Sequence, residues 1–177
     1  MHFSKWHVSM FFLIVCGMVM LTACQETQDN NARKKAVLST TFTMTASSHM
    51  NSDQHLSVDG LLSGSTIWHA QTPPHYPEWV QVKYSRPKKV KSFSMKPQDS
   101  SPNGQEYLRA PKDFQLAGGN DGKTWQTLLT VKNNIPGDSK QWGAWKIDTP
   151  GEYLYYRITI TAGGNPALLT IQQIKLD

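Results

Sequence analysis

The sequence predicts an all-β domain of the sandwich or jelly-roll class over residues 41–177, and three observations predict it. No stretch after Thr41 repeats its apolar residues with a helical period. Short runs rich in β-branched and aromatic residues recur instead, and Gly, Pro, Asn and Asp separate them. Many short strands with frequent turns and no helices are typical of sandwiches and jelly rolls.

Strand alternation is clearest in residues 79–84. Val80, Val82 and Tyr84 take one face there, while Gln81 and Lys83 take the other, as in a half-buried strand. The expected strands are residues 41–46, 79–84, 90–96, 113–117, 125–131, 145–148, 153–161 and 168–176.

Turn residues fall between these strands. Asp121-Gly122 separates two of them and predicts a hairpin, because glycine tolerates a positive φ. Pro87 and Pro102 are expected in connections, where a missing N–H leaves no strand hydrogen bond unmade.

The first 24 residues have the three-part layout of a secretory signal. A short polar start carrying Lys5 precedes the apolar residues 8–21, a run shorter than the roughly 20 residues that span a bilayer. Leu21-Thr22-Ala23-Cys24 resembles the lipobox of bacterial lipoproteins. We therefore predict a signal peptide over residues 1–23, lipidation of Cys24, and a lipid-anchored location in the bacterial cell envelope, at the outer membrane or cell surface. The alternatives are an uncleaved membrane anchor and a buried helix.

Residues 24–40 are polar and lack apolar periodicity, so we expect a flexible tether before the domain. Cleavage removes Cys16 and leaves Cys24 as the last cysteine, which excludes a disulfide within the mature chain. The chain has 18 basic and 13 acidic residues. This excess is too small for the basic stripe of a nucleic-acid-binding protein, so no nucleic-acid partner is expected.

A set of motifs spaced along the domain carries a family resemblance. The motifs are Asp59-Gly60, Ser65-Thr66-Ile67-Trp68-His69, Pro74-His75, Lys96-Pro97-Gln98, Phe114-Gln115-Leu116, Asn120-Asp121-Gly122-Lys123-Thr124-Trp125, Tyr155-Tyr156-Arg157-Ile158 and Ile171-Gln172-Gln173-Ile174. In order and spacing the chain resembles the discoidin family, also called coagulation factor V/VIII type C domains, and within it the family 32 carbohydrate-binding modules. The resemblance implies a jelly-roll β-sandwich of the galactose-binding-domain type.

The resemblance also implies one structural Ca²⁺ ion, a cation that prefers six to eight oxygen ligands. Gln173 stands where the family usually has Glu, which leaves one formal negative charge instead of two and implies weaker binding. The alternative is that Asp59-Gly60 forms a simple turn without a metal. The implied ligands are Asp59, Thr66 and Gln173, with backbone carbonyls of Leu56, Leu61 and Gln172.

In sugar-binding members of the family, loops at one end of the sandwich form a shallow site. Thr72 and Pro97 depart from the family's stacking aromatic residue and arginine, so galactose specificity does not carry over. His69 has a second interpretation, which is capping or packing against Pro74 and His75. The implied ligand-binding residues are His69, Lys96, Gln98 and Asn103, with Tyr76, His75 or Tyr107 as replacement stacking surfaces.

Other residues have both a structural and a functional interpretation. Trp79 and Trp125 are expected in the core, with a ligand platform as the alternative. Arg109 is expected to support a loop, with ligand contact as the alternative. The basic cluster Arg86, Lys88, Lys89 and Lys91 is expected to be a solvated turn, with an anionic glycan contact as the alternative.

No motif in the chain is typical of an enzyme. It has no G-x-S-x-G elbow, no H-E-x-x-H and no glycine-rich phosphate loop. We therefore predict a non-catalytic lipoprotein that captures glycans. The alternative is a protein-interaction or adhesion module of an envelope complex that uses the same loops, and phospholipid binding is a third hypothesis that only Met50 supports.

Overall fold

The computed structural model describes residues 41–50 and 56–177. The predicted signal peptide, the lipidated Cys24 and the tether lie outside the described residues. Within the described ranges, no helix is both long enough and apolar enough to cross a membrane.

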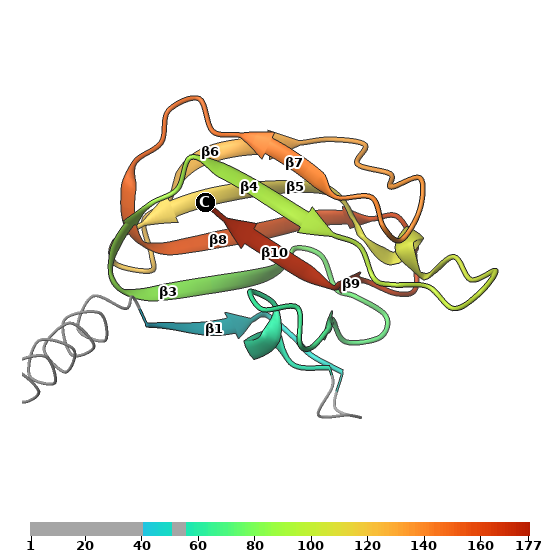
Figure 1. The fold of residues 1–177 in the computed structure, drawn as a ribbon. Coiled ribbons are helices and arrows are strands. Elements are labelled where there is room, and N and C mark those ends of the chain that lie inside the picture. Colours follow the sequence, from blue (N-terminus) through green and yellow to red (C-terminus); the bar gives the residue numbers. More distant parts are fainter. Residues whose placement is uncertain (1–40, 51–55) are drawn as a thin grey trace, which may run out of the picture. The chain divides into compact units, whose positions relative to one another are not determined.

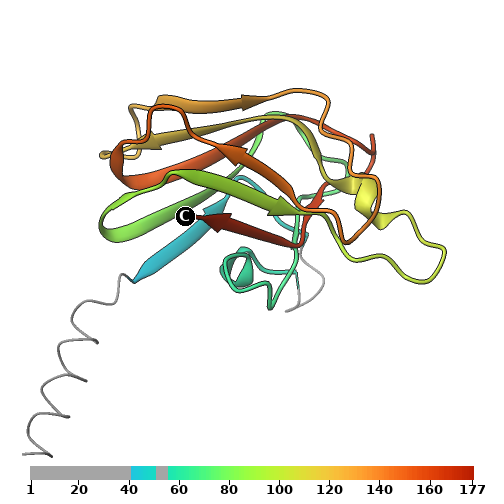
Figure 2. The same cartoon turned by 45° about the horizontal axis from the view of Figure 1, so that its top comes forward.

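The domain is a sandwich of antiparallel sheets, in which a three-stranded layer covers a five-stranded layer (Figures 1 and 2). The five-stranded sheet has the order β1 (Phe42–Ala46), β3 (Glu78–Lys89), β8 (Glu152–Gly163), β5 (Pro111–Gly119) and β6 (Gln126–Val131). The three-stranded sheet has the order β10 (Gln173–Leu176), β4 (Ser92–Lys96) and β7 (Gly143–Lys146). β2 (Trp68–His69) pairs with β9 (Thr170–Ile171), and η1 (Val58–Gly60) and η2 (Glu106–Arg109) are short 3₁₀ turns. The predicted all-β jelly-roll sandwich is confirmed.

The core fills the space between the two sheets. The side chains that alternate inward along β3 and β8, such as Val80, Val82 and Ile158, are almost completely buried. From the facing sheet, Phe93 stacks on Trp145 at 5.7 Å between ring centroids and meets the edge of Phe114 at 6.0 Å. Burying these rings together with the aliphatic side chains of both sheets stabilises the sandwich.

Most strand boundaries shift by a few residues from the sequence-based expectation, β2 was not expected, and some differences have a clear physical reason. Pro87 lies inside β3 instead of in a connection, at a register shift between Lys83 and Lys88 where a missing N–H is tolerated. The last expected strand is split into β9 and β10 at Gln172, because its backbone N–H turns to the Lys96 carbonyl. The 3₁₀ turns η1 and η2 are too short to carry a helical period.

The predicted hairpin between β5 and β6 is confirmed, and Gly122 has a φ of 71°. The Asp121 carboxylate accepts hydrogen bonds from the N–H groups of Lys123 and Thr124 at 2.8 and 2.7 Å. These bonds favour the ionised form and lower the pKa of Asp121 to about 2.

A carboxylate whose pKa is lower in the folded state than in the unfolded state stabilises the fold at pH values above the unfolded-state pKa. This contribution is lost as the pH falls from the ordinary aspartate value of 3.8 through about 2. We expect the amide NMR signals of Lys123 and Thr124 to titrate with a midpoint near 2, and Asp121→Asn to abolish that titration. A midpoint close to 3.8 in the folded protein would contradict the assignment.

Candidate functional site

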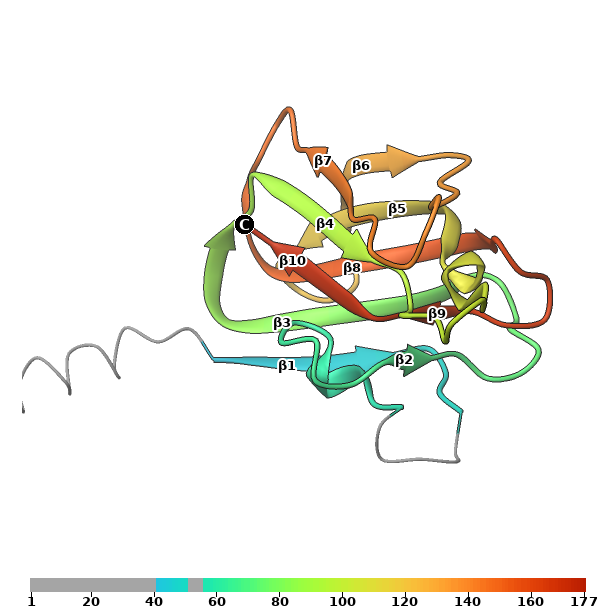
Figure 3. The ribbon, with the colours of Figure 1, turned by 45° about the vertical axis from the view of Figure 1, so that its right-hand side comes forward.

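Connections from both sheets meet at one end of the sandwich, which we call the loop end (Figure 3). It comprises residues 70–77, 97–110, 132–142 and 164–169, together with the adjoining strand ends at His69, Lys96 and Thr170. Backbone hydrogen bonds tie these segments together, from Gly164 N to the Ala110 carbonyl at 2.9 Å and from Asn134 N to the Lys112 carbonyl at 2.9 Å. Thr41, where the described chain begins, enters β1 at the opposite end of the sandwich (Figure 1).

Trp68 and His69 of β2 anchor one side of the loop end. Trp68 is fully buried, and its Nε1–H donates to the Ser48 carbonyl at 3.0 Å. His69 is also buried, and its Nδ1 lies 2.7 Å from the Ala70 carbonyl oxygen. Because a carbonyl only accepts, Nδ1 carries the proton and Nε2 of the neutral ring is an acceptor. The described ring contact of His69 is thus with the carbonyl of its own neighbour, Ala70, and Nε2 is the acceptor that remains.

A buried acid, Glu78, holds the loop that precedes β3. Its carboxylate accepts hydrogen bonds from the hydroxyls of Ser47 and Ser48 and, at 3.0 Å, from the backbone N–H of His75. Ser48 Oγ also accepts from Gln71 N at 3.1 Å. This cluster fixes the geometry of residues 70–77, in which Tyr76 stands.

Tyr76 is an exposed ring of the predicted site, with 36% of its surface open to solvent. Its hydroxyl lies against Gly163, where any added Cβ atom would come within 2.4 Å of it. Partial burial raises the pKa of Tyr76, and a backbone hydrogen bond with Gly163 opposes that rise. The ring is thus held at its polar tip and presents an aromatic surface at the loop end.

Lys96 and Gln98 follow one another at the end of β4. Lys96 pairs with Asp99, with Nζ 2.7 Å from Oδ1, and its carbonyl accepts from Gln172 N at 3.1 Å. Gln98 is half-buried, and its Oε1 atom accepts no hydrogen bond within the described part of the chain. The ion pair neutralises Lys96, whereas Gln98 keeps an unused acceptor.

Asn103 lies apart from the other predicted ligand residues. It is exposed, has a φ of 66°, and stands in a turn that the bond from Gly104 N to the Ser101 carbonyl closes at 2.8 Å. Asparagine tolerates this left-handed conformation better than most residues, so the turn explains its presence. The structure places all five predicted ligand residues at the loop end, and within residues 41–50 and 56–177 no hydrogen bond joins the Asn103 side chain to the other four.

Unsatisfied polar atoms concentrate at this end. Three buried side-chain oxygens of residues 41–50 and 56–177 lack a hydrogen-bond partner, and they belong to Gln98, Glu106 and Thr170. Gln98 and Glu106 lie on the β4–β5 connection, and Thr170 pairs with His69 across β2 and β9. An unpaired buried oxygen costs free energy, so the two on the β4–β5 connection mark it as a segment whose polar groups are not all satisfied within the described residues.

A small pocket of about 40 Å³ opens beside Pro97, between the ends of β4 and β7. Ile135, on the adjoining loop, is 62% exposed. The pocket mixes apolar side chains with two amides, and its lining consists of Met95, Pro97, Ala110, Asn134, Ile135, Pro136, Gln141 and Gly143. The sequence did not point to this pocket, because its residues come from four separate segments.

The predicted calcium ligands also come together, at η1 and the start of β10. Thr66 Oγ1 accepts from Gly60 N at 3.0 Å and donates to the Ser57 carbonyl at 2.6 Å. The Gln173 amide reaches the Leu62 carbonyl at 3.4 Å. Backbone and amide oxygens of this kind suit calcium, but the described ranges contain no group of three acidic, His or Cys side chains that could hold a metal.

Two further residues of the set, Leu61 and Gln172, already have hydrogen-bond partners. Leu61 O accepts from Ile174 N at 3.0 Å, while Gln172 bonds to Asp99 N through its side chain at 3.3 Å. Leu56 is half-buried at the start of the second described range. We propose that this set, with Asp59 as its single carboxylate, is a low-affinity calcium site.

We therefore expect wild-type protein to bind Ca²⁺ with a dissociation constant of about 1 mM, as low-affinity extracellular sites do. Gln173→Glu restores a second negative charge and should bind Ca²⁺ roughly tenfold more tightly by calorimetry. Gln126→Glu, on an exposed position of β6, is the matched control and should leave the affinity unchanged. Equal affinities in both variants would contradict this location of the site.

Two tryptophans depart from their expected place. Trp79 and Trp125 are half-buried on the outer face of the five-stranded sheet instead of in the core. Strand alternation explains Trp79, because it shares its face with Gln81 and Lys83. Trp145 does pack against the core, whereas Trp142 lies under Lys175, with Nζ 4.3 Å from its ring centroid.

Comparison with solved structures supports the fold. The family 32 carbohydrate-binding module of Clostridium perfringens NanJ, in complex with galactose, is 19% identical with a TM-score of 0.57, covering 76% of this chain and 92% of that one. Chitosan-binding module 1 from a chitosanase/glucanase of Paenibacillus sp. IK-5 is 17% identical with a TM-score of 0.60, covering 76% and 93%. A pectin-binding carbohydrate-binding module is 18% identical with a TM-score of 0.59, covering 78% and 92%.

The family is established by a match between the sequence and a protein-family model. No curated protein matches the chain. The F5/8 type C domain model matches residues 43–171, which include β1, the loop end and β9. The chain therefore belongs to the F5/8 type C domain family.

Proposed function

We propose that this protein is a non-catalytic, glycan-binding lipoprotein of the bacterial envelope, which binds sugar at the loop end. The observation that carries the proposal is the exposed ring of Tyr76 at the loop end, where the β4–β5 connection also holds unpaired buried oxygens of Gln98 and Glu106. Sugar hydroxyls both donate and accept, so they satisfy such oxygens, and an aromatic ring covers the apolar face of a sugar.

Each group at the loop end has a defined role in this proposal. Gln98 offers an amide group on the β4–β5 connection, and Tyr76 offers the stacking surface. His69 Nε2 is an acceptor at the base of the site. Pro97 stands where an arginine would be implied, and it lines the small pocket instead. The three solved relatives are described with galactose, chitosan and pectin, so the fold leaves the sugar open.

The predicted anchor supports the same function. β1 starts at the end of the sandwich opposite the loop end (Figure 1), away from the proposed sugar site. A lipid at Cys24 raises the local concentration of the module at the envelope surface. Labelling cells with radioactive palmitate tests the anchor, because Cys24→Ser should abolish the label.

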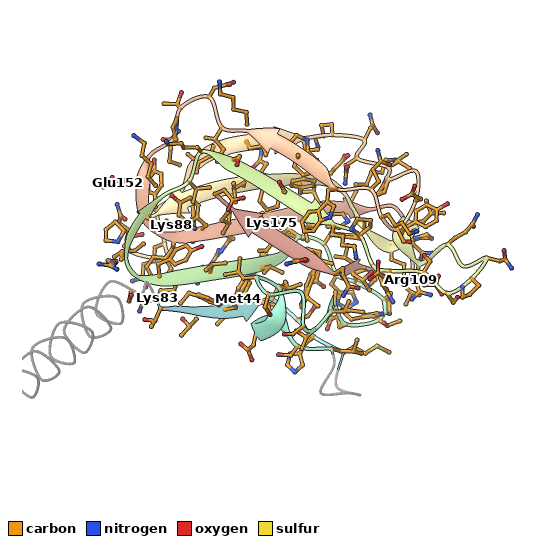
Figure 4. All side chains as sticks on the ribbon, in the orientation of Figure 1. Met44, Lys83, Lys88, Arg109, Glu152 and Lys175 are labelled. Carbon is orange, nitrogen blue, oxygen red and sulfur yellow. The ribbon has the colours of Figure 1, made fainter. Side chains whose placement is uncertain are left out.

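The glycan site is tested on an array of glycans and then by calorimetry with the sugar that binds best. Tyr76→Ala and Gln98→Ala should each weaken binding about tenfold, as loss of a stacking surface or of a buried hydrogen bond does. Glu152→Gln, on an exposed position far from the loop end (Figure 4), is the control and should bind normally. Folded protein that binds no glycan on the array would refute the proposal.

A second function has one observation in its favour. The exposed Ile135 beside the apolar pocket suits a protein partner, since interface cores are apolar. If the surface binds a protein, this chain should co-purify with a stoichiometric envelope protein, and Ile135→Asp should abolish that co-purification. Added sugars should not displace the bound protein. The same variant leaves sugar binding through Tyr76 intact if the first function holds.

A further inference from the structure

The outer face of the five-stranded sheet has a side-chain pattern that the loop-end function does not use. Its positions alternate with the buried residues of β3 and β8, so they point away from the core. Three cross-strand rows make up this face, which we call the sheet platform. They are Thr45–Gln81–Arg157–Ala117–Thr127, Thr43–Lys83–Tyr155–Gly119 and Trp79–Thr159–Gln115–Thr130.

A guanidinium group sits between two indole rings at the centre of the platform. The Arg157 Cζ atom lies 4.5 Å from the ring centroid of Trp79 and 4.4 Å from that of Trp125. Gln81 Oε1 accepts from its Nε and Nη2 atoms at 3.1 and 2.8 Å. This arrangement holds Arg157 rigidly and leaves the rest of its donor fork without a described partner.

The aromatic surface continues across the sheet. Trp125 meets the edge of Tyr155 at 6.4 Å, and Lys83 Nζ lies 5.5 Å from the Tyr155 centroid. Gly119 makes this possible, because a Cβ atom there would come within 3.2 Å of the Trp125 ring and within 2.4 Å of the Thr124 carbonyl. The remaining side chains are mostly threonines, whose short hydroxyls keep the surface low between the rings.

The charge on the platform has one sign. None of its row positions is Asp or Glu, while Lys83 and Arg157 are both cations. The ion pairs of the described ranges join other residues, Lys96 with Asp99 and Lys132 with Asp113. Asp121, in the adjoining hairpin, is engaged by the N–H groups of its own turn. Partial burial lowers the pKa of Arg157, as expected for a cation without a counter-charge.

We propose that the sheet platform is a second binding surface, which takes a segment of an acidic polysaccharide. Lys83 on β3 and Arg157 on β8 lie on neighbouring strands, offset along the strand direction by two residues, or about 7 Å. Uronate carboxylates approach these two cations. The C–H faces of the sugars lie on the rings of Trp79, Trp125 and Tyr155. The guanidinium fork matches a carboxylate, and its fixed position reduces the entropy that binding loses.

The Lys83 side of this surface lies away from the loop end, while the row that begins at Trp79 adjoins it. Figure 4 shows Lys83 on β3 well away from Arg109, which lies at the loop end. The proposal therefore does not depend on sugar binding by the loops, and the two surfaces can fail independently.

Polygalacturonate is the test ligand, and binding is measured by calorimetry and by affinity electrophoresis. Wild-type protein should bind it, and raising NaCl from 50 to 500 mM should weaken binding because salt screens the contacts. Lys83→Gln should weaken binding about three- to fivefold and Trp125→Leu about five- to tenfold. Lys146→Gln removes the same charge from an exposed position of β7, on the other sheet, and should change nothing. Thermal unfolding of each variant confirms that it is folded.

Three outcomes would overturn the proposal. Folded wild-type protein that does not bind polygalacturonate is the first, and equal losses in Lys83→Gln and Lys146→Gln, which indicate a net-charge effect, are the second. The third is loss of binding in Tyr76→Ala but not in Lys83→Gln, which assigns the acidic ligand to the loop end and supports the loop-end function alone.

Discussion

Replacing Trp68 by alanine is expected to lower the free energy of unfolding by about 3–5 kcal/mol. Trp68 is completely buried, and its Nε1–H satisfies the Ser48 carbonyl at 3.0 Å. The change therefore removes a large apolar volume and leaves a backbone oxygen unpaired. Since domains of this size are stable by about 5–15 kcal/mol, we expect the melting temperature to fall by roughly 10–15 °C.

Trp142→Ala is the matched control for that experiment. Trp142 is only half-buried, and its described partner is Lys175, with Nζ 4.3 Å from the ring centroid. Loss of such a contact costs about 0.5–1 kcal/mol. Thermal and urea unfolding of both variants give the comparison. Similar losses at the two positions would mean that Trp68 does not hold the loop end together.

Glu78→Ala is expected to lower the free energy of unfolding by about 2–4 kcal/mol, although it removes a charge. The Glu78 side chain is 1% exposed and accepts from Ser47, from Ser48 at 2.8 Å and from His75 N at 3.0 Å. Alanine leaves these donors without an acceptor in a place that water hardly reaches. The loop with Tyr76 should loosen, so glycan binding should weaken together with stability.

The control for Glu78 is Glu152→Ala, at the exposed start of β8 (Figure 4). A substitution at such a surface position usually changes stability by less than about 0.5 kcal/mol. Unfolding is measured by circular dichroism and binding by calorimetry on the same samples. If Glu78→Ala unfolds like wild type, the carboxylate is not the acceptor that organises residues 70–77.

Much of the fold could be predicted from the sequence because its strands alternate cleanly. Val80, Val82 and Tyr84 are buried as predicted, and Asp121-Gly122 closes the expected hairpin. The same alternation also places Glu78 inward and Trp79 outward. The general preference of tryptophan for protein cores led to the wrong expectation for Trp79. Strand phase was thus a better guide to burial than residue type.

The candidate site could be predicted only in part, since its residues come from distant segments. His69, Tyr76, Lys96, Gln98 and Asn103 all lie at the loop end, but the sequence could not show that Asp99 neutralises Lys96. Nor could it show that Gln98 keeps a free acceptor or that Arg157 stands between two indoles. Such pairings depend on cross-strand register and loop closure, which local patterns do not encode.

The most direct test of the central claim is a ¹⁵N NMR titration of the domain with the neutral sugar that binds best on the array. If the loop end is the glycan site, shifts should concentrate in the amides of residues 70–77 and 97–105, and Tyr76→Ala should remove them. The amides of β4, β7 and β10 away from the loops should stay in place. A saturable titration that leaves the loop-end amides unmoved would contradict the account.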